Sequence, residues 1–486
     1  MLATACLLCV QVAQASNGPI PLLVGPKGPV SLPAGGDGFS MFRMPSGIAW
    51  NLDHRVDLHV FAFQGTRVMR NPLNDFEGDS FSPGGNFGMV FAPGRVPYDG
   101  NDEPPTPSLG ALERFTFGFG IYPDMAGGSA SNDVRYTTFP QTVELKSAIT
   151  FIAGAFNMTY RPNKWLAFGL GLHAIYSAVD TTSLVGGGDT PLNGSPTING
   201  VALPGNPTYA DFLNLFASDG ATDPTTLFTT DLTSVQFSGI LSLSLRPTDQ
   251  FALGLSYRPR SWDPLGFEGD ATIDASATFA SALSGLDPVI RDLFLSTLPD
   301  GGNNGFVAEY DVELKGLRVP RQIRMSMVLR PHDRVLIGAE IAWTEWHRAF
   351  RKNIVSLKNG SNTDLNFVIG STSLDSVSKN RWRNVWTFSA YTAVAATEDL
   401  TLRLGGVIQR NPVNAHTQGG VPTTGFTGNM VSFGAGYWIG DLELNAAIEH
   451  GFHTSGRGRR DPGLTASQSY YSSKQWFFHL GASYLF

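Results

Sequence analysis

Charged residues are scarce in this chain of 486 residues: Asp, Glu, Lys and Arg make up only 15% of it, against about 25% in typical soluble proteins. The chain also lacks an apolar run of about 18 residues, which a membrane-spanning helix would need. Its net charge of -7 argues against nucleic acid as a partner, because a surface that binds nucleic acid is usually basic. A helical membrane protein and a nucleic-acid-binding protein are therefore both disfavoured.

Cysteine is nearly absent, and both cysteines lie close to the start. Cys6 and Cys9 fall in an apolar run over residues 1–12 that is followed by Ala13-Gln14-Ala15. This pattern is typical of the hydrophobic region and cleavage site of a signal peptide. We therefore expect residues 1–15 to be a signal peptide, and its missing basic region suggests that the start is truncated. A lipoprotein cysteine so near the start is a poor candidate, so the mature chain would have no disulfide and no thiol chemistry.

Motifs for catalysis are absent as well. The sequence contains no G-x-S-x-G, no H-E-x-x-H, no Walker loop and no ordered Rossmann fingerprint, so the common sites of hydrolases, metalloproteases and nucleotide-binding enzymes are not indicated. The nine histidines are dispersed, and we interpret them as solvated or lumenal residues. We expect no enzyme activity, no cofactor and no metal. Spacing alone leaves open a hydrolase with a Ser and His on a barrel wall.

Segments in which apolar and polar residues alternate are the main pattern of the chain, most clearly over residues 382–486. There, pairs of segments meet across the short turns Thr397-Glu398 and Gly440-Asp441 and are separated by longer loops. Residues 233–245 place Val, Phe and Leu on one face and Ser and Gln on the other, and a period of two is typical of a strand with unlike faces. Short turns at one end and long loops at the other are typical of outer-membrane β-barrels.

We therefore predict an all-β fold, a transmembrane antiparallel β-barrel of about 14 strands, an even number as bacterial barrels require. The barrel would carry an N-terminal plug and short helices in its outer loops. Apolar faces would contact lipid, and faces with Ser, Gln, Arg and Glu would line the lumen. A soluble all-β protein would reverse these faces. The leader, the asymmetry of turns and loops, and the low charge together favour a membrane barrel over a soluble all-β protein.

The segment that precedes the first strand is rich in Gly and Pro and shows little periodicity. It covers residues 16–50 and is too apolar for a solvated tail and too broken for a helix. We predict that it forms a plug, or hatch, inside a barrel made of residues 51–486. A flexible N-terminal arm is the alternative.

One candidate strand near the N-terminus contains glycines and ends at a proline. Gly118 and Gly120 alternate with apolar residues, and Pro123 follows Tyr122 directly. Proline removes a donor from the ladder and glycine weakens pairing, so the sequence predicts a break or kink near Tyr122. The alternative is that the strand simply ends there.

Two loop segments show a helical spacing of apolar residues. Phe212 and Phe216 belong to the first, over residues 209–217, and Leu286 and Leu293 belong to the second, over residues 279–298. Their apolar faces either pack on each other or form an outer groove for a hydrophobic molecule, because an exposed apolar patch often marks a binding site.

Several charged residues fall on faces that we infer to point inward. A solvated channel lining is the ordinary explanation for them. The functional alternative is that an arginine meets the carboxylate of an amphiphile through a charge-assisted hydrogen bond, and Arg324 is the first candidate. The inferred inward-facing charges are Arg324, Glu340, Arg403, Glu443 and Glu449.

Local patterns in order along the chain are similar to landmarks of a known family. Met44-Pro45-Ser46-Gly47-Ile48-Ala49 precedes the first strand, and the segments 86–93, 251–258 and 411–413 follow in order. Together they resemble the outer-membrane long-chain fatty acid transporter family (FadL/TodX-like). Its hatch ends in Asn-Pro-Ala-Gly-Leu-Ala, so Met44 stands in place of the asparagine.

The resemblance implies a fourteen-stranded barrel plugged by a hatch, with Pro45 and Gly47 in the hatch motif. It also implies that hydrophobic molecules diffuse from an external groove through an inner pocket to a lateral opening. That opening would lie at a kinked third strand, the position that Gly118, Gly120 and Pro123 occupy.

We therefore predict an outer-membrane channel for passive uptake of hydrophobic compounds, such as long-chain fatty acids or aromatic hydrocarbons. Expected partners are the hydrophobic solute, outer-membrane lipid and lipopolysaccharide, with no nucleic acid, and we expect a monomer. The alternatives are a general water-filled porin, a barrel enzyme acting on lipids, and a structural or adhesive barrel. The apolar, proline-rich N-terminal segment argues against an open pore.

Overall fold

The computed structural model describes residues 32–34, 37–51, 53–93, 112–136, 139–186, 197–198, 201–202, 225–263, 266–284, 287–351, 353–369, 371–378, 382–412, 428–457 and 470–486. The predicted signal peptide therefore lies outside the described residues. One sheet of eighteen strands contains all but the short pair β6 (Thr197–Ile198) and β7 (Val201–Ala202). No helix among the described residues is long and apolar enough to cross a membrane.

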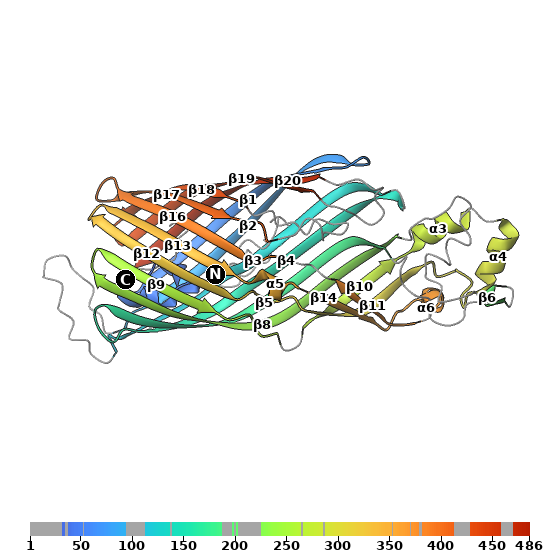
Figure 1. Ribbon diagram of the computed structural model, residues 1–486, viewed down its shortest axis with the longest axis horizontal. Helices are drawn as coiled ribbons and strands as arrows, with labels where there is room; N and C mark the ends of the chain where they lie inside the picture. Colours follow the sequence, from blue (N-terminus) through green and yellow to red (C-terminus); the bar gives the residue numbers. More distant parts are fainter. Residues whose placement is uncertain are drawn as a thin grey trace.

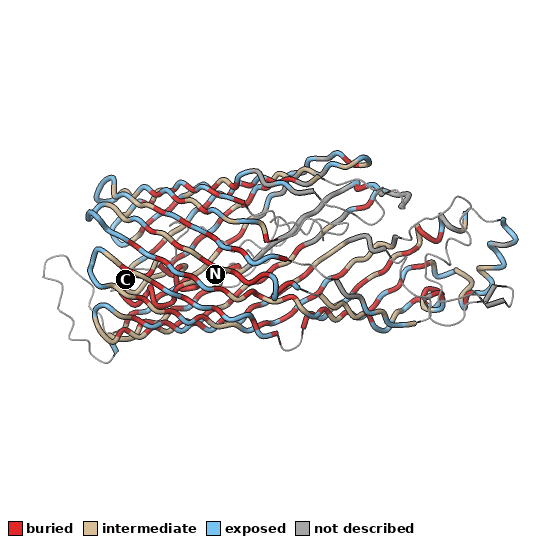
Figure 2. Tube along the Cα trace, viewed as in Figure 1, coloured by how far each residue is buried: buried red, intermediate tan, exposed pale blue. Residues whose placement is uncertain are grey.

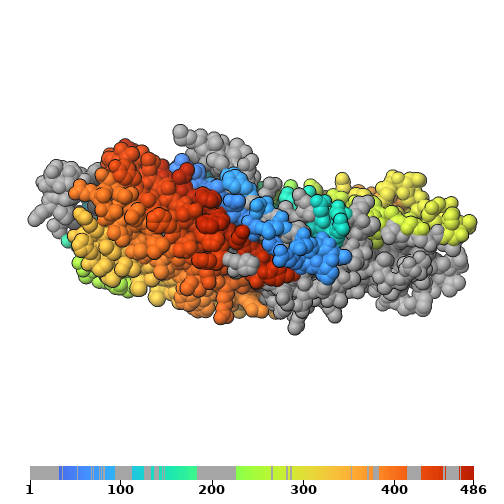
Figure 3. All heavy atoms as spheres, turned by 90° about the horizontal axis from the view of Figure 1, so that it is seen from above, coloured from blue at the N-terminus to red at the C-terminus, as the bar shows by residue number. Residues whose placement is uncertain are grey.

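The large sheet closes on itself as an antiparallel barrel. Its last strand, β20 (Tyr470–Leu485), pairs with its first strand, β1 (Arg55–Arg70), along the full length of both. Figure 3 shows this seam, with the C-terminal strands in red beside the N-terminal strands in blue. Because the barrel is closed, the backbone groups of β1 and β20 have hydrogen-bond partners, which a backbone surrounded by hydrocarbon requires. The predicted transmembrane β-barrel is confirmed.

Neighbouring crossings of the wall follow one another along the chain (Figure 1). Besides β1 and β20, the crossings made by one strand are β2 (Asp75–Phe91), β3 (Phe115–Tyr136), β4 (Phe139–Tyr160), β5 (Leu166–Gly186), β8 (Thr225–Thr248), β17 (Leu400–Gln409), β18 (Met430–Ile439) and β19 (Leu442–Arg457). Four crossings consist of two strands and a break: β9 (Phe251–Arg258) with β10 (Phe267–Asp274), β11 (Val307–Lys315) with β12 (Gln322–His332), β13 (Val335–Thr344) with β14 (Asn353–Lys358), and β15 (Leu374–Ser378) with β16 (Val385–Ala395). The eighteen strands thus make the fourteen predicted crossings.

The four breaks lie side by side in the wall. On one side of them β9, β12, β13 and β16 pair in that order, and on the other side β10, β11, β14 and β15 do. The alternating pattern over residues 306–329 and 334–356 predicts one strand in each range, and this prediction is wrong, because each range forms two strands. Pro259 and Pro320 fall in the first two breaks, and a proline cannot donate to a ladder. The third break holds the short helix α5 (Trp346–Ala349).

Buried and exposed residues alternate along the strands (Figure 2), and the chemistry of the two faces reverses at the breaks. On the short-turn side, which we call the membrane section, β12 exposes Ile323, Met325, Met327 and Leu329 and buries Gln322, Arg324 and Ser326. On the loop side, which we call the outer section, β11 buries Ala308, Tyr310, Val312 and Leu314 and exposes Glu309 and Asp311. Apolar side chains thus face outward in the membrane section and inward in the outer section, as expected if lipid surrounds the first and water the second. The predicted lipid-facing and lumenal sides are therefore found in the membrane section only.

Short helices stand beyond the outer section, at the end opposite the short turns (Figure 1). They are α3 (Ser276–Ser284), α4 (Pro288–Thr297) and α6 (Thr363–Ile369). The predicted helical segment 279–298 is thus two helices. The Asp287 side chain accepts a hydrogen bond from the backbone nitrogen of Val289 at 2.9 Å and caps α4, and Pro288 suits the first helical position.

Residues 37–51, which we call the inner segment, lie against the inner face of the membrane section. They form the short helices η2 (Ser40–Phe42) and η3 (Pro45–Trp50), and every residue of both is buried. The backbone nitrogen of Ser46 donates to Oγ of Ser242 on β8 at 2.8 Å. Pro45 begins η3, and a Cβ atom on Gly47 would come within 2.1 Å of the Leu32 carbonyl oxygen. Glycine at this motif position therefore permits a close backbone approach.

Candidate functional site

The interior of the outer section is lined by apolar side chains from strands far apart in the sequence. Phe151 on β4 and Phe267 on β10 meet edge to face, with ring centroids 6.3 Å apart. At the level of the breaks, Phe350 stacks on Trp382 at 4.3 Å, and Trp346 packs against both. The buried residues of this outer lining include Phe151, Ile175, Val179, Leu232, Phe267, Ile273, Tyr310, Val312 and Leu314. Such a lining favours hydrocarbon over water or ions.

The interior of the membrane section is polar, and its charges are paired. Arg324 donates to Oε1 of Glu340 at 2.9 Å and to Oε1 of Gln322 at 3.0 Å. Arg403 on β17 donates to Asn445 and Glu443 on β19 at 2.6 and 2.5 Å. A ligand carboxylate at Arg324 would therefore compete with Glu340, so the predicted ligand-binding role of Arg324 stays a prediction.

Two histidines meet inside the wall although 420 residues separate them. Nε2 of His59 on β1 lies 2.9 Å from Nδ1 of His479 on β20, and Asn86 on β2 lies 3.0 Å from the other ring nitrogen of His59. Nε2 of His479 lies 2.8 Å from Oε1 of Glu449. This pair lies inside the barrel, as we expected of the histidines. The contacts that the two rings make were not predicted. Within the described part of the chain, no group of three or more His, Cys, Asp or Glu is placed to hold a metal ion.

The wall is paired over only a short length between β2 and β3. Their ladder runs from Phe87 opposite Ile121 to Phe91 opposite Phe117. β3 continues past this point and stays paired with β4 as far as Tyr136. Its register with β4 shifts between Pro123 and Met125, which marks a bulge at Asp124. The predicted kink is thus a bulge, and the alternative that the strand ends at Tyr122 is wrong.

Gly118 and Gly120 lie on the inner face of β3, just below the bulge. A Cβ atom on Gly118 would come within 2.4 Å of the Met41 sulfur, and one on Gly120 would come within 2.5 Å of Cζ of Phe42. Phe42 also stacks on Tyr122 with ring centroids 4.0 Å apart. The inner segment therefore rests directly on the part of β3 where the ladder with β2 ends.

An exposed apolar surface beyond the outer section belongs to α4 (Figure 1). Val289 and Leu293 are 74% and 53% exposed, whereas Phe294 and Leu295 pack against the apolar interior. Leu293 is the one predicted groove residue whose position is described. Phe212, Phe216 and Leu286 lie outside the described residues.

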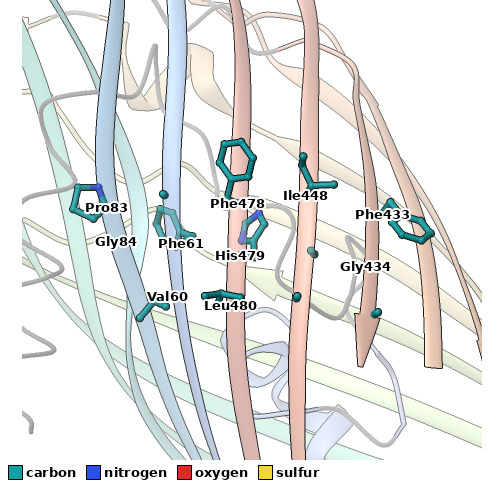
Figure 4. A pocket seen from close by; sticks show the side chains of 14 residues that line it. Val60, Phe61, Pro83, Gly84, Phe433, Gly434, Ile448, Phe478, His479 and Leu480 are labelled. Atoms are coloured by element: carbon teal, nitrogen blue, oxygen red, sulfur yellow. The ribbon is translucent and has the colours of Figure 1, made fainter. Parts of the chain in front are cut away.

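A separate apolar hollow of about 660 Å³ lies on the outer wall of the membrane section. Figure 4 shows its lining, which comes from β18, β19, β20, β1 and β2. The hollow exists because small residues line it, namely Gly84, Ala435 and Ala446. Larger exposed side chains surround it, those of Phe433, Phe478 and Leu480. Since these side chains point away from the lumen, the hollow belongs to the lipid-facing surface and not to the interior.

Comparison with known proteins gives a family match and a shared fold. The family model "Outer membrane protein transport protein (OMPP1/FadL/TodX)" matches residues 110–486. The Pseudomonas putida toluene transporter TodX is similar, with a TM-score of 0.65 and 15% identity over 98% of this chain and 100% of that chain. A Pseudomonas aeruginosa FadL homologue gives 0.65 and 16% over 97% and 98%. The Ralstonia pickettii toluene transporter TbuX gives 0.62 and 14% over 96% and 100%. At these identities the structures establish a common fold, and no curated protein sequence matches this chain.

Proposed function

Because this chain belongs to the outer membrane protein transport protein (OMPP1/FadL/TodX) family and is an outer-membrane β-barrel, we propose that it admits hydrophobic compounds by passive diffusion. The candidate compounds are long-chain fatty acids and aromatic hydrocarbons. The structural relatives named as toluene transporters support including the second class. Closure of the barrel by β1 and β20 of one chain supports action as a monomer.

The observation that carries this proposal is the reversal of the interior at the breaks. A hydrophobic solute gains roughly 0.8 kcal/mol for each methylene that it buries against apolar surface, and the outer lining offers such surface. The wall below is polar and charge-paired, and the inner segment, with the apolar residues Met41, Phe42 and Ile48, lies against its inner face. A solute that has reached the outer lining is therefore favoured to leave sideways rather than along the axis.

The unpaired part of the wall between β2 and β3 is the proposed lateral opening, with Gly118, Gly120 and Pro123 at its base. Through it, a solute would enter the hydrocarbon of the membrane and avoid the charged lipopolysaccharide layer. The inner segment, with Pro45 and Gly47, is the proposed hatch that closes the axial path. α4, with Leu293, and the segments holding Phe212, Phe216 and Leu286 are proposed to capture the solute first. Arg324 is proposed to meet a carboxylate only after it leaves Glu340.

The test uses the purified full-length barrel. Binding of a fluorescent long-chain fatty acid is titrated in detergent, uptake is measured in cells that lack their own transporter, and ion conductance is recorded in planar bilayers. Saturable binding and uptake with little conductance would support the proposal. Steady conductance without saturable binding would contradict it and leave a general porin.

A further inference from the structure

Asp124 is the bulge residue of β3 and takes no place in the ladders on either side. Pro123 pairs with Ile152 of β4 and Met125 pairs with Phe151, so the register passes over Asp124. The ladder with β2 has already ended at Ile121. Asp124 is therefore where β3 leaves its regular path and parts from β2.

The Asp124 side chain reaches inward to Arg258, the last residue of β9. Nη1 and Nη2 of Arg258 donate to Oδ1 and Oδ2 of Asp124, each at 2.6 Å. Both side chains are only 6% exposed. Nε of Arg258 donates to Oγ of Ser238 at 3.2 Å and fixes the guanidinium from the other side. This two-bond arrangement is the strongest geometry for a guanidinium and a carboxylate.

The ion pair joins strands that are not neighbours. β4, β5 and β8 lie between β3 and β9 in the wall. The contact therefore runs across the interior and draws the bulge inward, away from β2. Just below it, Tyr122 stacks on Phe42, its hydroxyl lies 2.9 Å from Nδ1 of His173, and its side chain also hydrogen-bonds with Asp124 of the ion pair.

A gap between two strands of a barrel stays open only if a contact keeps the strands apart. Two strand edges that face each other across a gap carry unpaired backbone groups, which favour pairing strongly where water is scarce. Without an inward pull, β3 would lose its bulge and extend its ladder with β2 beyond Ile121. The gap would then close.

We propose that the Asp124–Arg258 ion pair keeps the lateral opening between β2 and β3 from closing, and we call this ion pair the tie. This inference rests on the proposed function and names the residues that set its exit. Both are positioning residues, because they act on the wall and not on the solute.

The experiment breaks the tie in the full-length barrel by Asp124→Asn or Arg258→Met. Uptake of the fluorescent fatty acid should fall about tenfold or more, the change that about 1.4 kcal/mol in an open–closed equilibrium produces. Binding of the same probe should stay near the native value. On β2, the amide hydrogens of residues 78–86 that point away from β1 should exchange more slowly, because the extended ladder protects them. A merely destabilised barrel would exchange faster.

Two double variants separate a tie from simple stabilisation. The charge swap Asp124→Arg/Arg258→Asp should restore uptake, whereas Asp124→Leu/Arg258→Met should restore heat resistance but not uptake, because an apolar pair packs without pulling. Glu443→Gln is the matched control, since it breaks another buried ion pair of the interior, with Arg403, away from the opening. It should leave uptake unchanged.

The proposal is overturned if the single variants take up the probe at the native rate or faster, or if the apolar double variant does. A native barrel that neither binds nor takes up the probe would instead contradict the proposed function itself. The two failures are thus distinguishable.

Discussion

The backbone nitrogen of Ser46 lies directly on the inner face of Gly169, where a Cβ atom would come within 2.3 Å of it. The same nitrogen donates to Oγ of Ser242 at 2.8 Å. A glycine on β5 and a serine on β8 thus hold one peptide group of the inner segment between them. The inner segment is docked by backbone contact, which any side chain at Gly169 would prevent.

Gly169→Ala should loosen the inner segment without unfolding the barrel. Overpacking of a well-packed site typically costs about 1–3 kcal/mol, and the inner segment can relieve it by moving away from β5. We expect steady ion conductance in planar bilayers from this variant and little from the native barrel. Gly154→Ala is the control, because the nearest atom to its Cβ is 4.0 Å away. Equal conductance of the two variants would contradict the docking described.

The position of the membrane is tested by charges on the outer surface. Met325 on β12 is 56% exposed in the membrane section, so Met325→Arg should cost about 2–4 kcal/mol near the bilayer midplane. Asp270 on β10 is exposed in the outer section, and Asp270→Arg should cost little there. Unfolding by urea in lipid vesicles measures both. Similar losses at the two positions would place the membrane boundary elsewhere than at the breaks.

The apolar lining of the outer section should set the affinity for the solute. Leu232→Ala removes three buried carbon atoms from it, which at about 0.8 kcal/mol each weakens binding of a long-chain fatty acid by roughly 2.4 kcal/mol, or about fiftyfold. The measurement is a binding titration with the fluorescent probe. Leu232→Met, which nearly conserves volume, is the control and should bind almost as the native protein does. Unchanged binding in Leu232→Ala would show that the solute does not reach this lining.

The exposed face of α4 should act on capture rather than on final affinity. Val289→Ser with Leu293→Ser removes two exposed apolar side chains of the helix. Association and dissociation of the probe in stopped-flow measurements should slow by the same factor, so that their ratio, the dissociation constant, stays the same. Asp292→Asn, on the same exposed helix, is the control. A change confined to dissociation would place α4 in the final binding site instead.

Much of the barrel could be predicted from local pattern. The strand count, the short turns and the outward faces of the membrane section follow from a period of two and from turn residues, and each of these depends only on near neighbours in the chain. The kink near Tyr122 was predictable for the same reason, because Pro123 acts on its own strand. The breaks at residues 316–321 and 345–352 were missed. Pro320 was a signal for the first, whereas alternation on both sides of each break resembles one continuous strand.

The sequence by itself determined a closed barrel with unlike faces, since alternation and turn chemistry are local properties of the chain. Only the tertiary structure decided where those faces exchange roles and which side chains meet across the interior. Asp124 finds Arg258 at a distance of 134 residues, and Arg324 finds Glu340 rather than standing free for a ligand. The physical reason is that a contact across the lumen depends on closure of the whole barrel, with its full set of strands and registers, and no local segment encodes that closure.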